Sequence, residues 1–322
     1  MVELVPGVSV ELPLLQAGMG GGIAGAALAA AVSDAGAIGT IGLLPPERLS
    51  AELGCARELT GAPISVNLIV PLAGARHWRI ADDADLVVTH WEAQPRRRTS
   101  APWIHTCGSI EEARLAVGAG ADGVIAQGVE AGGHVRGTIA ALDLLERILA
   151  VVPPGFPVLL AGGIAERADV VKGLDVGARA VIAGTRFLAC EESGAHPDYK
   201  QRLVDGSETV LTELFGMGWP RAPHRVLRNG ATERWLGAEA AVPAAIGALH
   251  GLLSPIAAYA PQRLQGRLAA RAASGPLDLL PFPPTGAMAR ATLETHPLYA
   301  GETVARVSDL PPAGELVGRL RP

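Results

Sequence analysis

Short apolar segments alternate with helix-type patterns along the first part of the chain. The first unit runs from the apolar segment 13–19 through a glycine-rich turn to the alanine-rich stretch 26–35, which stops before Gly36. Glycine directly after the last helical residue is a common helix stop. An apolar strand followed by a turn and a helix is the unit of α/β proteins, whose parallel strands are buried on both faces. The pattern therefore predicts a parallel sheet.

The same unit recurs as far as residue 190. The pattern predicts eight strands, at 13–19, 37–42, 63–70, 85–90, 102–107, 123–128, 157–163 and 180–187. Helices are predicted at 26–35, 45–60, 109–118, 142–152 and 167–177, with a short helix at 75–84 and a loop at 92–101. Eight strands that alternate with helices favour a (β/α)8 TIM barrel over residues 1–190.

The glycines before residue 26 also allow a doubly wound sheet. Gly20, Gly22 and Gly25 match the G-x-G-x-x-G spacing of a dinucleotide-binding turn. That fold also needs an acidic residue about 20 positions later, at the end of the second strand, to bind a ribose. The second predicted strand instead ends in Thr-Ile-Gly at 40–42. We therefore favour the barrel.

The composition changes after Cys190. Residues 191–235 are more polar, and residues 236–322 carry helical patterns interrupted by proline clusters. The segments 242–259 and 261–273 have the pattern of a helix pair. The sequence therefore predicts a second part, 191–322, in which a mainly helical lid packs on the barrel.

Composition and charge narrow the class of protein. The chain has 322 residues, of which 49% are hydrophobic, and a net charge of -5. The absence of a basic patch argues against nucleic-acid binding. Cys55, Cys107 and Cys190 are too far apart to suggest a disulfide framework. The apolar stretch 18–44 contains Asp34 and many glycines, so it does not resemble a membrane span. We expect a soluble, cytoplasmic protein.

A glycine-rich loop with one histidine follows the sixth predicted strand. Residues 127–134 read Gln-Gly-Val-Glu-Ala-Gly-Gly-His. Glycines let backbone amides approach a ligand closely, and histidine titrates near neutral pH. By itself the loop could be a surface turn. In a TIM barrel, however, the active site lies at the carboxyl ends of the strands, so His134 is the candidate catalytic residue.

The last two predicted strands also end in glycines. Strand seven runs into Gly162 and Gly163, and strand eight runs into Gly184 and Thr185. Backbone amides and a hydroxyl in this place can donate hydrogen bonds to a phosphate. Adjacent tight turns without a ligand are the alternative. TIM barrels often bind phosphate after strands seven and eight, which favours a phosphate site.

Two amide side chains interrupt otherwise apolar strands. Asn67 lies in the third predicted strand and Gln127 ends the sixth. Buried amides need hydrogen-bonding partners, and the pyrimidine edge of a flavin offers both donors and acceptors. A phosphate site together with amides that could face a ring suggests FMN as the cofactor.

Taken together, these motifs resemble the FMN-dependent nitronate monooxygenase family, formerly called 2-nitropropane dioxygenases. The similarity extends to segments 14–19, 191–193, 226–229 and 299–302. The resemblance implies a catalytic role for His134 and oxidation of alkyl nitronates by O2 to a carbonyl compound and nitrite. It implies FMN binding by Met19, Gly20, Asn67, Gln127, Gly132, Gly133, Gly162, Gly163, Gly184 and Thr185.

The resemblance covers more than one activity. Related branches reduce enoyl thioesters or quinones with NAD(P)H, and a flavoenzyme of specialised metabolism or a flavin-binding protein without turnover are further alternatives. Some relatives have a lysine near the flavin where this chain has Thr106. Without that charge, backbone amides, helix N-termini or an arginine such as Arg136 or Arg186 would have to stabilise the anionic reduced flavin.

The remaining candidates concern the substrate side. His90 and Trp91, at the end of the fourth strand, could line it or could pack at the rim, and Tyr299 could contact substrate from the lid. Cys107 is expected to be a buried apolar residue rather than a nucleophile. The eight histidines show no metal-ligand spacing, so no metal is expected. A homodimer is plausible for the fold.

Overall fold

A computed structural model of the chain describes residues 1–322 except 93, 217–218, 220, 237–241, 260–278 and 280. Eight parallel strands form one sheet in the order β3-β11-β10-β8-β7-β6-β5-β4. A parallel bridge between Leu15 and Ile38 joins the two ends of this order, so the sheet closes into a barrel. The predicted TIM barrel is confirmed. The strands are β3 (Leu14–Gln16), β4 (Gly39–Ile41), β5 (Ile64–Ile69), β6 (Leu86–His90), β7 (Trp103–Cys107), β8 (Gly123–Gln127), β10 (Val158–Ala161) and β11 (Ala180–Ala183).

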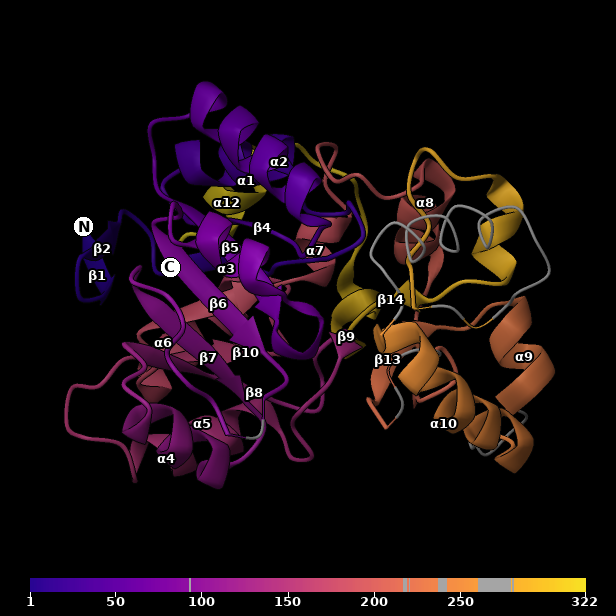
Figure 1. The fold of residues 1–322 in the computed structure, drawn as a ribbon. Helices are drawn as coiled ribbons and strands as arrows, with labels where there is room; N and C mark the ends of the chain where they lie inside the picture. Colours follow the sequence, from indigo (N-terminus) through magenta and orange to yellow (C-terminus); the bar gives the residue numbers. More distant parts are fainter. Residues whose placement is uncertain (93, 217–218, 220, 237–241, 260–278, 280) are drawn as a thin grey trace.

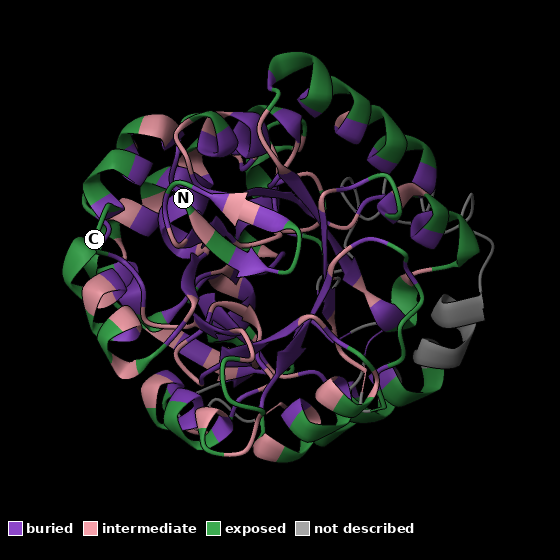
Figure 2. Ribbon diagram, turned by 90° about the vertical axis from the view of Figure 1, so that its left-hand side faces the viewer, coloured by how far each residue is buried: buried purple, intermediate pink, exposed green. Residues whose placement is uncertain are grey.

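Helices surround the barrel, with exposed residues outside and buried strands inside (Figure 2). Ser109 caps α4, because its side chain accepts a hydrogen bond from the backbone N of Glu112 at 3.2 Å. Pro46 begins α2, where its missing N–H is not needed. The helices of this part are α1 (Ala26–Asp34), α2 (Pro46–Leu59), α3 (Ala75–Ala81), α4 (Ile110–Gly118), α5 (Ala141–Leu149), α6 (Arg167–Val176) and α7 (Thr185–Leu188).

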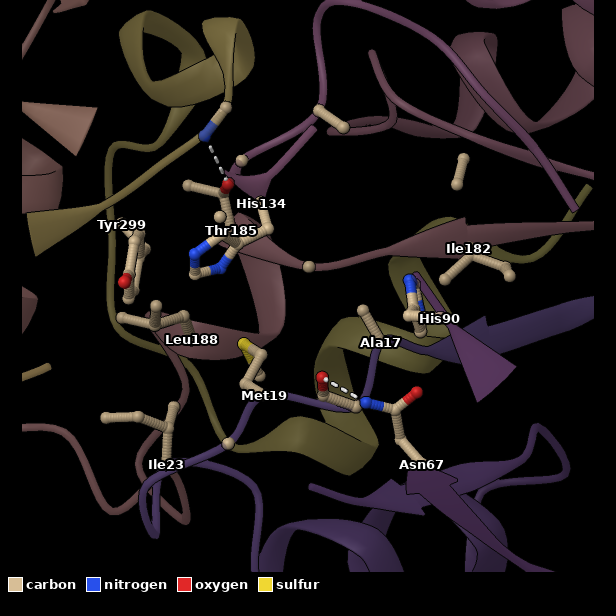
Figure 3. A pocket seen from close by; sticks show the side chains of 18 of the residues that line it. Ala17, Met19, Ile23, Asn67, His90, His134, Ile182, Thr185, Leu188 and Tyr299 are labelled. Carbon is tan, nitrogen blue, oxygen red and sulfur yellow. Dashed lines mark hydrogen bonds between the residues drawn. The ribbon is translucent and has the colours of Figure 1, made fainter. Parts of the chain in front are cut away.

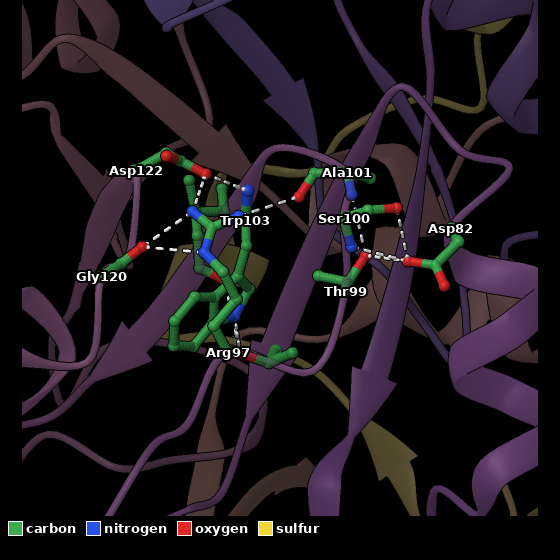
Figure 4. A network of polar contacts seen from close by, with 10 residues as sticks. Asp82, Arg97, Thr99, Ser100, Ala101, Trp103, Gly120 and Asp122 are labelled. Carbon is green, nitrogen blue, oxygen red and sulfur yellow. Dashed lines mark hydrogen bonds and ion pairs between the residues drawn. The ribbon is translucent and has the colours of Figure 1, made fainter.

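The described residues between β6 and β7 form a loop, as predicted, instead of a helix. Arg97 donates from Nη2 to the carbonyl of Gly120 at 2.7 Å and pairs with Asp122 at 2.5 Å. Asp82, just after α3, accepts a hydrogen bond from the hydroxyl of Thr99 at 2.7 Å. Figure 4 shows this network. These contacts hold the loop against the segments that precede β8 and follow α3.

Two features of the barrel differ from the prediction. The last strand ends at Ala183 rather than at residue 187, because the chain turns at Gly184 into the short helix α7. The hairpin of β1 (Val2–Val5) and β2 (Val8–Val10) was not predicted. Its apolar side chains pack with barrel residues such as Leu86, so the hairpin fills one end of the barrel.

The chain after Cys190 contains strands as well as helices. β12 (Thr209–Thr212), β13 (His224–Leu227) and β14 (Leu298–Tyr299) form an antiparallel sheet, and β9 (Gly133–His134) of the barrel loop pairs with β13. The hydrophobic pattern did not predict this sheet. The other elements are α8 (Pro197–Asp205), α9 (Gly230–Leu236), α10 (Ala244–Tyr259), η2 (Arg290–Glu294), η3 (Glu302–Arg306) and α12 (Ala313–Leu320).

The C-terminal helix returns to the barrel. α12 packs against α1 and α6, whereas β12, β13 and α8 to α10 lie beside the barrel (Figure 1). The first helix of the predicted pair corresponds to α10, and the second, 261–273, lies outside the described residues. Among the helices that the structure describes, none has the length and apolar character needed to cross a membrane. The division of the chain at residue 190 stays a prediction.

Candidate active site

A cavity of about 290 Å³ lies at the carboxyl ends of the barrel strands, and Figure 3 shows side chains that line it. Its wall contains the predicted catalytic, cofactor-binding and substrate-contacting residues, although these residues come from distant parts of the chain. They are Met19, Gly20, Asn67, His90, Gln127, Gly132, Gly133, His134, Gly162, Gly163, Gly184, Thr185 and Tyr299. The structure thus brings these residues together at one place.

The loop that carries His134 is held from two sides. On the barrel side, Gln127 donates from Nε2 to the carbonyl of His134 at 3.2 Å and accepts from the backbone N of Arg136 at 2.8 Å. On the other side, His134 pairs with His224 of β13. Arg225, next along β13, donates from Nη2 to the carbonyl of Val129 at 2.8 Å. The amide of Gln127 is therefore engaged in positioning the loop.

The ring of His134 is packed among aromatic side chains. It stacks on Trp219 with ring centres 4.0 Å apart, and Tyr299 and Trp91 lie at 5.6 Å and 5.9 Å. Its Nε2 atom is buried and has no hydrogen-bond partner in the described structure. Burial lowers the pKa of His134 well below its usual value, and the neighbouring His224 adds to the effect. The ring is therefore neutral at neutral pH and has a nitrogen available for a ligand.

Asn67 presents a second unsatisfied group. Its Nδ2 donates to the carbonyl of Gly18 at 3.4 Å, but its buried Oδ1 has no partner in the described structure. A Cβ on Gly18 would lie 2.8 Å from Cγ of Asn67, so only glycine lets the backbone pass here. An unsatisfied buried acceptor costs about 1–3 kcal/mol. A ring N–H donor, as on the pyrimidine edge of a flavin, would satisfy it, so Asn67 fits the implied cofactor.

The glycines at the opposite edge leave room for a phosphate. Gly162 and Gly163 have φ values of 111° and 80°, which favour glycine. A Cβ on Gly163 would meet no atom within 4 Å, so open space lies in front of this backbone. The hydroxyl of Thr185 accepts from the backbone N of Gly301 at 2.9 Å and orders the neighbouring segment. The amides of these turns fit an anionic group that enters the cavity.

The position that some relatives fill with lysine forms a neutral pair here. Nε2 of His90 lies 3.2 Å from the hydroxyl of Thr106, and burial lowers the pKa of His90 to about 3. Arg136 and Arg186, which we considered as substitutes for the lysine, form ion pairs with Glu112 and Asp309. Neither arginine is among the residues that line the cavity.

The cavity wall as a whole carries little charge. The described residues that line it include no lysine or arginine. Its one carboxylate, Glu130, accepts hydrogen bonds from the backbone N of Ala141 at 3.0 Å and 3.1 Å, at the start of α5. That carboxylate is therefore engaged in capping a helix. Charge on a bound ligand must be met by backbone amides and by neutral rings.

Some wall residues were not recognised in the sequence. Trp219 stacks on His134, and Phe282 and Pro283 line the cavity from the segment before η2. These residues lie in irregular segments, where no periodic pattern indicates which way a side chain points. Cys107, by contrast, is buried as expected, and burial raises the pKa of its thiol to about 12. A thiol with this pKa is a poor nucleophile.

Comparison with known proteins agrees with the geometry. The sequence profile described as nitronate monooxygenase matches residues 4–101 and 89–322. The chain belongs to the nitronate monooxygenase family. It is 31% identical over 268 residues to a probable nitronate monooxygenase of Bacillus subtilis, a match that covers 67% of this chain and 77% of the relative.

Two proteins with other printed activities are similar to the chain to a comparable degree. The crystal structure of a nitroalkane oxidase from Streptomyces ansochromogenes superposes with a TM-score of 0.73 at 30% identity and covers 98% of this chain and 95% of that one. A (3aS,4S,5R,7aS)-5-hydroxy-7a-methyl-1-oxo-octahydro-1H-indene-4-carboxyl-CoA dehydrogenase of Mycobacterium tuberculosis is 33% identical over 248 residues, 70% of this chain and 66% of the relative. The chain is thus a flavin-dependent oxidoreductase, and membership does not by itself name the substrate.

Proposed function

We propose that the protein binds FMN and oxidises alkyl nitronates with O2 to a carbonyl compound and nitrite. The observation that carries the proposal is the pair of unsatisfied groups in one cavity, Nε2 of His134 and Oδ1 of Asn67. One of them suits the substrate and the other suits the cofactor. When bound, the flavin supplies the redox chemistry, and the protein supplies orientation and electrostatics.

The residues of the chain have separate tasks in this proposal. Asn67 accepts a hydrogen bond from the ring of the cofactor, and the amides of Gly163 and Gly184 donate to its phosphate. His134 approaches the nitro group of the substrate through Nε2. Because an anionic nitronate raises the pKa of a nearby imidazole, substrate binding favours proton uptake by His134. With a neutral nitroalkane, the same nitrogen could accept the α-proton.

A flavin-dependent dehydrogenase or reductase that uses NAD(P)H is the second candidate. The similarity to the Mycobacterium tuberculosis CoA dehydrogenase favours it. Against it stands the absence of lysine and arginine among the described residues that line the cavity, because a dinucleotide or CoA carries several phosphates. A flavin-binding protein without turnover would have little reason to keep the unpartnered Nε2 of His134 buried.

Anaerobic stopped-flow absorbance separates these candidates. The purified protein, loaded with FMN, is mixed with the nitronate of 1-nitrobutane and, separately, with NADH and NADPH. We expect rapid bleaching of the flavin by the nitronate and nitrite formation once O2 is admitted. Rapid bleaching by a nicotinamide, with no response to the nitronate, would assign the protein to the reductase branch. If no compound changed the flavin absorbance, both candidate functions would be disproved.

A further inference from the structure

Trp91 has an unusual backbone conformation next to the active site. It follows the last residue of β6 and has a φ of 69°, in the left-handed region that bulky side chains rarely adopt. Such conformations persist only where the surrounding structure enforces them, and they concentrate at functional sites. The conformation of Trp91 therefore suggests that this residue has a role in the active site.

The indole of Trp91 contacts an arginine that does not line the cavity. The guanidinium of Arg136 lies 4.7 Å from the centre of its ring, and Arg136 is paired with Glu112. A cation over an indole face is an attractive contact, strongest where water is excluded. Gly108 lets the backbone of Arg136 pass, because a Cβ at Gly108 would overlap with it. The position of the ring is thus fixed by several residues.

On the cavity side, Trp91 belongs to an aromatic wall around the candidate catalytic histidine. Its ring meets Trp219 edge-on at 5.1 Å and His134 at 5.9 Å, and Tyr299 lies 5.6 Å from His134 on another side. We call Trp91, Trp219 and Tyr299 the aromatic wall. A substrate that reaches Nε2 of His134 must place its substituents against these rings.

We propose that Trp91 is a specificity-determining residue that limits the substituent on the reacting carbon to a compact group, within a wall whose lack of cations limits it to an uncharged one. The inference rests on the proposed function and names the substrate class: short alkyl nitronates, as distinct from nitronates that carry a carboxylate or a phosphate. The aromatic wall excludes bulk. Since no lysine or arginine of the described chain lines the cavity, a second negative charge on the substrate would be buried without a partner.

The test compares kcat/KM across a series of nitronates for the wild type and for Trp91→Gly. Glycine adopts the positive φ without strain and removes the ring. We expect the ratio of kcat/KM for the 1-nitrohexane nitronate to that for the nitroethane nitronate to rise about tenfold or more, as removal of a steric limit in an apolar pocket allows. A ratio within about twofold of wild type would overturn the size limit.

Trp235→Ala is the matched control. Trp235 in α9 also lies under an arginine, with the guanidinium of Arg234 4.8 Å from its ring, but it does not line the cavity. We expect this variant to keep the wild-type ratio. If it raised the ratio equally, the effect would be general loosening and the proposal would fail. Trp91→Asn serves as a second variant if the glycine variant does not fold, because asparagine tolerates positive φ.

The charge limit is tested with propionate 3-nitronate against the uncharged 1-nitrobutane nitronate. We expect kcat/KM of the wild type to be about tenfold or more lower for the carboxylate compound. Equal or higher kcat/KM for propionate 3-nitronate would overturn this part of the proposal.

A binding measurement keeps the inference separate from the proposed function. If the wild type oxidises no nitronate, the proposed function fails, yet nitrobenzene and 1-nitronaphthalene still report on the size of the pocket because neither has an α-hydrogen to react. Their Kd values are measured from changes in flavin absorbance. Trp91→Gly should bind 1-nitronaphthalene about tenfold more tightly relative to nitrobenzene than the wild type does. An unchanged ratio of Kd values would overturn the proposal.

Discussion

At the scale of one residue, the burial of His134 sets its pKa and therefore its protonation state. Burial among Trp219, Trp91 and Tyr299 removes the water that would stabilise an imidazolium, so the ring stays neutral. A neutral imidazole has one donor and one acceptor nitrogen, and Nε2 is buried without a hydrogen-bond partner in the described structure. Burial thus keeps the ring uncharged and also leaves Nε2 available for a hydrogen bond to the substrate.

Replacing this ring should abolish turnover and leave the cofactor bound. We expect His134→Asn to lower kcat by about 10²- to 10⁴-fold, the usual range for a general acid or base, because the asparagine amide cannot take up or release the proton. The flavin content of the purified variant should equal that of the wild type. Steady-state nitrite formation and the flavin-to-protein absorbance ratio measure the two effects.

His105→Asn is the control for this prediction. His105 is buried, and burial lowers its pKa to about 4, but it does not line the cavity and it contacts Thr89. The control should lose stability and keep its kcat. A His134→Asn enzyme with wild-type kcat would show that the ring has no chemical role.

At the scale of elements, the candidate site depends on close contacts between distant loops. Gly132 passes directly beside the segment that leads from β14 to η3, where a Cβ would lie 2.6 Å from the carbonyl carbon of Ala300. The backbone N of Glu302 donates to the carbonyl of Glu130 at 3.0 Å in the same region. The segment after β14 and the histidine loop therefore pack backbone against backbone.

A methyl group at this contact should separate the two segments. We expect Gly132→Ala to weaken flavin binding by about tenfold or more and to lower the free energy of unfolding by about 1–3 kcal/mol, since the backbone must shift to accommodate it. Gly118→Ala in α4, where a Cβ meets nothing, should keep flavin affinity and be neutral or slightly stabilising. Equal flavin affinity in the two variants, measured by titration of the apoprotein, would contradict the prediction.

Arg225 provides a link between β13 and the histidine loop. Its guanidinium is nearly buried, donates from Nε and Nη2 to the carbonyl of Val129, and pairs with Glu302 at 2.9 Å. We expect Arg225→Met to lower kcat/KM by about tenfold or more, because the loop loses an anchor that costs about 1.5–3 kcal/mol to remove. The control is Arg202→Met, which removes an exposed ion pair with Glu294 and should change kcat/KM little. Similar losses in both variants would argue against a specific role for Arg225.

At the scale of the whole molecule, buried histidines make the fold sensitive to acid. Burial lowers the pKa of His105 and of His224 to about 4, from an ordinary value of 6.5. Below pH 6.5 the unfolded chain binds protons at these rings that the folded protein does not bind. Their contribution to stability is complete above pH 6.5 and is lost as the pH falls toward 4.

This loss should appear in the free energy of unfolding. We expect that free energy to fall between pH 6.5 and pH 4 by roughly 1 kcal/mol per pH unit for each of the two rings. Urea titrations at pH 7, 6 and 5 measure how the free energy of unfolding changes with pH. His105→Asn should reduce this slope by the contribution of one histidine ring. A free energy of unfolding that stays constant from pH 7 to pH 5 would contradict the assignment of neutral buried rings.

The barrel could be read from the sequence because its information is local. Each strand or helix must bury one or both of its faces, and this requirement produces the apolar pattern from which the element is predicted. Residues such as Ser109 and Pro46 mark where helices begin. The rule that sites lie at the carboxyl ends of barrel strands then placed His134 and Asn67 on one rim. Local pattern and a general property of the fold were sufficient for these predictions.

The tertiary structure alone decided what surrounds those residues. The pairing of β9 with β13, the antiparallel sheet and the aromatic wall join segments far apart in the chain, and no periodicity specifies which distant segments meet. The low pKa of His134 and the left-handed backbone of Trp91 follow from that packing. The sequence by itself determined a barrel, its family and the residues of its rim, because these follow from burial patterns and motifs. The neutrality and shape of the pocket follow from long-range contacts, because burial by distant side chains sets both.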